Sequence, residues 1–117
     1  MHPSRRALVA SLAALPMVAT TAATTAAARA DPIVAAIERH RAAFAALETV
    51  DELASPARYA AAEQEVFASG EAMFATEPQT VAGCKALVNF MVEDDPDGVE
   101  GGRCLDTLRR GLDRLAA

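Results

Sequence analysis

Apolar side chains recur at helical spacing from residue 31 onward, and no segment alternates with the period of a strand. Asp31 followed by Pro32 has the form of a helix N-cap with proline at the first helical position. The pattern predicts a helix that ends near Ala54, because Pro56 disfavours helical geometry at Ser55. The apolar stripe of this first helix consists of Ile33, Ile37, Phe44, Leu47 and Val50.

A second helix is predicted between Ser55-Pro56, which repeats the cap-plus-proline start, and Pro78, which ends it. Its apolar residues are Tyr59, Val66, Phe67, Met73 and Phe74. Gly70 falls on the same face, where it either permits close contact with the facing helix or marks a bend. Because the expected turn is very short, the first two helices should form a long antiparallel hairpin.

Two shorter helices follow this hairpin. Thr80 is a plausible N-cap for a helix from Val81 to about Glu93, and a second one starts near Arg103 after a loop rich in Asp and Gly. The last helix carries its apolar residues at steps of three and four: Leu105, Leu108, Leu112 and Leu115. We therefore expect one all-α domain over residues 31–117, with a four-helix, bundle-like arrangement.

The first thirty residues read as an export signal. Ser4, Arg5 and Arg6 precede a weakly apolar run rich in Ala and Thr, which resembles a twin-arginine signal more than a general secretory one. An uncleaved anchor is disfavoured, because the run lacks the roughly 20 strongly apolar residues of a stable span. Small residues at Ala28 and Ala30 predict cleavage after Ala30, with a site after Ala28 as the alternative. We expect a periplasmic or secreted protein without a stable membrane span after cleavage.

Composition narrows the function classes. Without Arg5, Arg6 and Arg29 the chain keeps 8 basic residues against 16 acidic ones, so binding to nucleic acid or anionic lipid is disfavoured. It has no Trp and one Tyr, which argues against recognition of sugars or bases by stacking.

Cys84 and Cys104 are the only cysteines, and each lies near the apolar side of its expected helix. In an oxidising compartment they would form a disulfide that closes about 20 residues and stabilises the domain by roughly 3 kcal/mol. Two separate buried thiols are the alternative. The spacing is not that of a Cys-x-x-Cys redox motif.

Candidate chemistry is sparse. His40, the only histidine after residue 30, has no carboxylate or thiol one helical turn away, so we interpret it as a surface or half-buried residue. The acidic stretch from Glu93 to Glu100 matches a calcium loop in part, but Cys104 stands where the bidentate Glu is required. We interpret that stretch as a solvated turn and expect no metal, cofactor or catalytic residue.

Two segments of the sequence resemble those of a known group of proteins. They are Asp31-Pro32-Ile33 with the following Ile37-Glu38-Arg39-His40-Arg41-Ala42-Ala43, and Glu77-Pro78-Gln79-Thr80-Val81-Ala82-Gly83 with Ala86-Leu87-Val88-Asn89-Phe90. The chain resembles a family of short, uncharacterised alphaproteobacterial helical proteins, many of which begin with a signal of this kind. The resemblance implies a helical hairpin with two shorter helices, and no activity. It draws attention to Pro78–Gly83, where free N–H groups at a helix start would either hold an anion or form an ordinary capped start.

The sequence as a whole predicts an exported, non-catalytic module that interacts with a protein or binds a small molecule, with a homo-oligomer as an open alternative. The competing hypothesis is a small periplasmic metal-binding protein or enzyme that uses His40 with nearby carboxylates.

Overall fold

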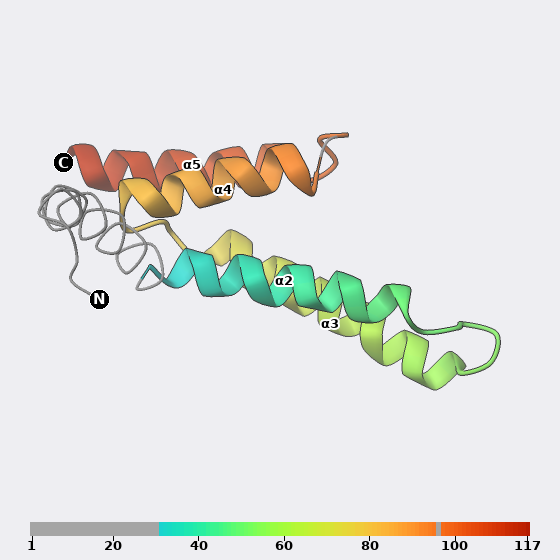
Figure 1. The fold of residues 1–117 in the computed structure, drawn as a ribbon. Coiled ribbons are helices and arrows are strands. Elements are labelled where there is room, and N and C mark those ends of the chain that lie inside the picture. Colours follow the sequence, from blue (N-terminus) through green and yellow to red (C-terminus); the bar gives the residue numbers. More distant parts are fainter. Residues whose placement is uncertain (1–30, 96) are drawn as a thin grey trace, which may run out of the picture.

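The computed structural model describes residues 31–95 and 97–117, which form four helices and, within these ranges, no strand. Figure 1 shows their order: α2 (Pro32–Glu48), α3 (Pro56–Ala75), α4 (Val81–Glu93) and α5 (Gly101–Ala116). The prediction of an all-α, bundle-like fold is confirmed. The expected export signal, with Ser4, Arg5, Arg6 and the cleavage residues Ala28 and Ala30, lies outside the described residues.

Helices α2 and α3 form the predicted antiparallel hairpin, but its turn is longer than expected. Helix α2 ends at Glu48 and not near Ala54. The reason is local, because the Asp51 carboxylate accepts the N–H groups of Leu53 (2.9 Å) and Ala54 (3.3 Å), which competes with helix continuation. Helix α3 starts at Pro56 as predicted, although the Ser55 side chain makes no capping hydrogen bond.

The fold has two layers, with α4 and α5 lying side by side over one half of the α2–α3 hairpin (Figure 1). All buried residues of α2 lie at or before Ala43, and all those of α3 lie at or after Ser69. The core forms where these halves meet α4 and α5, and its buried residues are Ile33, Ile37, Met73, Phe74, Leu87, Phe90 and Cys104. The far half of the hairpin, beyond these residues, extends past the second layer.

Helix α5 packs through small and polar residues. Its buried positions are Cys104, Thr107 and Gly111. The Thr107 hydroxyl (2.8 Å) and Arg110 Nη2 (2.7 Å) both donate to the Phe74 carbonyl near the end of α3. The leucine stripe predicted for this helix is largely outside the core, with Leu105, Leu112 and Leu115 exposed.

The expected disulfide is wrong for this structure. Cys84 and Cys104 are both buried free thiols. Each stands in the first turns of its helix, and α4 and α5 run antiparallel, so the two residues lie toward opposite ends of the pair. The rise of α4 from Cys84 to its end is already about 14 Å, twice the Cα separation that a disulfide spans.

None of the helices in the described ranges has the length and apolar character that crossing a membrane requires.

Candidate functional site

The two segments singled out in the sequence meet at the Asp31 carboxylate. Its Oδ1 caps α2 by accepting the Ile33 N–H (3.2 Å). Its Oδ2 accepts the N–H groups of Gln79 (2.8 Å) and Thr80 (2.9 Å). Oδ2 also accepts the Thr80 hydroxyl (2.8 Å), so one buried carboxylate joins the start of α2 to the start of α4.

Gly83 is part of the same junction. A Cβ placed on it would lie 1.9 Å from Asp31 Oδ2, so only glycine leaves room for the carboxylate. The Thr80 hydroxyl also accepts the Gly83 N–H at 2.9 Å, which confirms Thr80 as the N-cap. The anion at this helix start is therefore the protein's own Asp31, and the junction is a structural joint.

His40 is buried, which corrects the expectation of a surface or half-buried residue. Its ring is 1% exposed and packs between Phe44 (ring centroids 4.9 Å apart) and Phe90 (5.8 Å). Nδ1 lies 2.8 Å from the Ser69 hydroxyl of α3. Nε2 lies 3.6 Å from Glu100 Oε2 and has no hydrogen-bond partner among the described residues.

The hairpin accommodates the imidazole because the facing position on α3 is a glycine. A Cβ on Gly70 would lie 3.0 Å from His40 Cε1, closer than nearly all real contacts. The predicted role of Gly70 in close helix contact is thus confirmed. The partners Ser69 and Glu100 were missed by sequence reasoning, since they are 29 and 60 positions away along the chain from His40 and no local spacing marks them.

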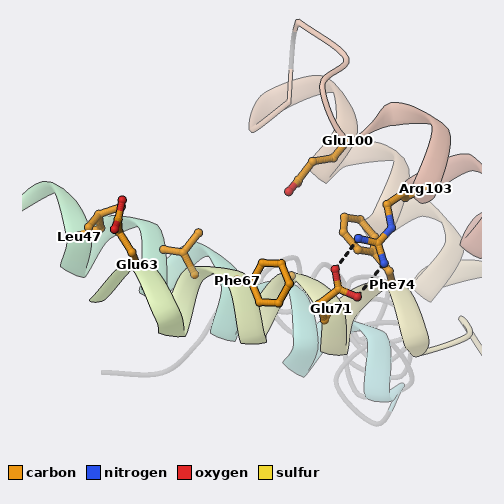
Figure 2. A pocket seen from close by; sticks show the side chains of 9 residues that line it. Leu47, Glu63, Phe67, Glu71, Phe74, Glu100 and Arg103 are labelled. Carbon is orange, nitrogen blue, oxygen red and sulfur yellow. Dashed lines mark hydrogen bonds and ion pairs between the residues drawn. The ribbon is translucent and has the colours of Figure 1, made fainter. Parts of the chain in front are cut away.

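A groove of about 340 Å³ lies beside this histidine, between α3 and the start of α5. Figure 2 shows its labelled side chains, which come from the α2–α3 hairpin and from the N-cap and first turn of α5. The lining residues are Leu47, Glu63, Val66, Phe67, Gly70, Glu71, Phe74, Glu100 and Arg103. The groove therefore combines an apolar surface with three carboxylates and one guanidinium.

Arg103 closes one end of the groove (Figure 2). Its guanidinium forms a two-pronged pair with Glu71, with 2.8 Å between Nη2 and Oε2, and lies over the Phe74 ring at 4.1 Å. The hydrogen bonds from Arg103 hold the pKa of the Glu71 carboxyl below its usual value. Because both partners are engaged, the unpaired charge of the groove comes from its other carboxylates.

The acidic stretch before α5 is largely used inside the protein. Asp94 pairs with Arg41 (2.7 Å), and Asp95 Oδ2 accepts the Glu100 N–H (3.0 Å), which orders the loop. No group of three or more His, Cys, Asp or Glu side chains stands in metal-binding proximity in the described ranges. His40 and Glu100 form a pair that falls short of a complete metal site.

A second candidate surface is formed by exposed aliphatic side chains of α4 and α5. Large aliphatic side chains recur on α4 at steps of seven and four, and on α5 at steps of seven and three. We call these six residues the aliphatic face: Val81, Val88, Val92, Leu105, Leu112 and Leu115, exposed between 41 and 68%.

Comparison with known proteins gives no assignment: no family model, no curated protein and no solved structure matches this chain. The function must therefore be argued from the site itself.

Proposed function

We propose that this protein is an exported, non-catalytic interaction module in which two copies pair through the aliphatic face. The observation that supports this is the exposure of six large aliphatic side chains on two adjacent helices, each of which buries a different face in the core. Scattered exposed leucines need no explanation, but a row of them on both helices of a pair is typical of an interface.

The size of the aliphatic face suits a modest interface. Burying one Val or Leu side chain removes roughly 60–120 Å² of apolar surface from water, so six half-exposed ones leave about 200–400 Å² per copy. Two copies would bury about twice this area, together with the alkyl parts of Lys85 and Arg109, and so approach the ~1,000 Å² total of a specific interface.

A second copy is the partner that the geometry favours. Helices α4 and α5 are antiparallel, so two such pairs stacked about a twofold axis complete a four-helix bundle. The charge on α5 does not oppose this arrangement, because Arg109 is paired within its own helix with Asp106 (2.9 Å) and Asp113 (3.2 Å).

Light scattering of the exported protein during size-exclusion chromatography tests the proposal. We expect a dimer at tens of micromolar, a monomer for Leu112→Glu, and an unchanged dimer for Leu53→Glu. Leu53 is the matched control because it is 92% exposed but lies in the α2–α3 turn. A monomeric wild-type protein, or equal behaviour of the two variants, would contradict the proposal.

The competing function, a metal-binding protein or enzyme that uses His40, gains one supporting observation from Glu100, which lies 3.6 Å from Nε2. It is distinguished by titrating Zn²⁺ into the protein and into His40→Asn. Stoichiometric Zn²⁺ binding that is lost in His40→Asn would favour the competing function. Heats no larger than those of dilution, in both proteins, would favour the interaction module.

Export remains part of the proposal and rests on residues 4–30 of the sequence. Replacing Arg5 and Arg6 by Lys should stop export through a twin-arginine pathway. Cell fractionation followed by detection of the protein measures this, and continued export of the variant would assign the signal to the general secretory route.

A further inference from the structure

The groove between α3 and α5 carries an excess of negative charge that the described residues do not balance. Of its three carboxylates, Glu71 is paired with Arg103. Glu63 and Glu100 have no Lys or Arg nitrogen within 4.0 Å in the described part of the chain. A cation is therefore the favoured kind of ligand for this groove, next to Glu63 and Glu100.

His40 supplies an independent indication of a ligand. The Ser69 hydroxyl lies 3.0 Å from the Val66 carbonyl, to which it can donate. With that hydroxyl donating to Val66, Nδ1 of His40 is the donor to Ser69. In the neutral ring Nε2 is then an acceptor, which has no hydrogen-bond partner in the described part of the chain and lies 3.6 Å from Glu100 Oε2. A buried acceptor without a donor is costly, and an N–H group brought to Glu100 and Nε2 would relieve that cost.

The rest of the groove suits an unbranched aliphatic chain. Leu47, Val66 and Phe67 provide the apolar surface, and Phe67 is 65% exposed although it belongs to the groove. Glu63 lies at one end of this surface in Figure 2, and Glu100 lies beyond Phe67 toward Arg103. From Glu63 to Gly70, which touches His40, α3 rises by about 10 Å, so two carboxylates flank an apolar stretch.

We propose that the groove binds a linear aliphatic amine. Its ammonium group donates to Glu100 and, after a small shift of that side chain, to His40 Nε2. Its methylene chain lies on Phe67 and Val66, and a second ammonium group, where present, reaches Glu63. A free di- or polyamine and a lysine side chain of a peptide share this chemistry. The proposal goes beyond pairing through the aliphatic face and uses a different surface.

Calorimetric titration of the full chain with four probes at physiological salt tests this proposal. The probes are 1,8-diaminooctane, octylamine, octanoate, and a short peptide with a single lysine between apolar residues. We expect saturable binding of the diamine, about tenfold weaker binding of octylamine, and no binding of octanoate. Tighter binding of the peptide than of octylamine would assign the source to a lysine side chain, and the reverse would assign it to a free amine.

Variants locate the site. Glu100→Gln keeps the shape of the side chain and should weaken diamine binding about tenfold or more. The matched control is Glu38→Gln, because Glu38 is an exposed carboxylate of α2 outside the groove. Phe67→Ala should weaken binding of both amines, whereas Val81→Ala, an apolar residue of similar exposure on another surface, should not. Diamine should also shift the ring ¹⁵N resonance of His40 in the wild-type protein.

Several results would overturn the proposal. One is equal binding by wild type, Glu100→Gln and Glu38→Gln, which would indicate attraction to the acidic surface in general. Another is octanoate binding as tightly as octylamine, and a third is no heat with any amine. The two proposals can fail separately, because Leu112 lies outside the groove and Leu112→Glu should bind the diamine as the wild type does. A monomeric wild-type protein that still binds the amine would refute only the pairing.

Discussion

The contacts of Asp31 predict that a substitution favoured by helix propensity, Gly83→Ala, will nevertheless destabilise the protein. Gly83 lies inside α4, where alanine is ordinarily preferred over glycine by about 1 kcal/mol. At this position a Cβ would lie 1.9 Å from Asp31 Oδ2 and 2.6 Å from its Cγ, so the carboxylate would have to leave. Gly83→Ala should therefore destabilise the protein.

The magnitude follows from the bonds that would be lost. Displacing the Asp31 carboxylate removes the acceptor of three backbone N–H groups and one hydroxyl. Hydrogen bonds to a charged group contribute about 1.5–3 kcal/mol each and are not additive, so a net loss of about 3–5 kcal/mol remains after the gain in propensity. This is a large part of the 5–15 kcal/mol typical of a domain.

Urea unfolding followed by circular dichroism at 222 nm measures the effect. Gly102→Ala is the matched control, because Gly102 lies in the first turn of α5 and a Cβ there would meet nothing within 4 Å. That control should be neutral or more stable by up to about 1 kcal/mol. In an Asp31→Ala background, Gly83→Ala should cost less than about 1 kcal/mol, because only the milder contact with Ile33 Cγ2 at 3.0 Å remains. The reasoning is refuted if Gly83→Ala is as stable as Gly102→Ala, or if its cost persists without Asp31.

Three further predictions concern buried polar groups. Ser69→Ala removes the partner of His40 Nδ1 and should lower the free energy of unfolding by about 1–2 kcal/mol in the same urea assay; an unchanged midpoint would speak against that hydrogen bond. Thr107→Val keeps the shape of the side chain but loses the hydrogen bond to the Phe74 carbonyl of α3, and should cost about 1 kcal/mol, with unchanged stability as the opposing result. Burial, together with nearby carboxylates, raises the pKa of the Cys104 thiol to about 11, and burial also raises that of Cys84. Because the unfolded thiol ionises first, the stabilising contribution of Cys104 is complete below about pH 8.5 and is lost toward pH 11. Stability of the wild type should fall more steeply over that range than that of Cys104→Ala, and native thiols should react slowly with iodoacetamide at pH 8.

The local elements could be predicted from the sequence because their signals are local. Asp31-Pro32, Thr80 and the 3.6-residue spacing define where α2 and α4 begin, and these starts agree with the structure. The end of α2 was misjudged because the Asp51 carboxylate binds the turn, a preference that competes with the apolar pattern.

Residue environments were predicted less well. His40 looked solitary because only its own helix was in view, and its contacts come from Ser69 and Glu100 on other elements. Cys84 and Cys104 looked close because their helices are consecutive, but antiparallel packing separates their first turns. The leucines of α5 looked like core residues, whereas Thr107 and Gly111 make the contact with the hairpin.

The all-α composition, the capped starts of α2 and α4 and the hairpin follow from the sequence, since each depends on interactions within a few residues of the chain. Only the tertiary structure decided which face of each helix is buried. The reason is that two apolar or small-residue faces compete on α5, and the closer approach allowed by Gly111 against Pro78 selects the one without leucines. That choice exposes the aliphatic face, and the same packing brings Glu100 to His40.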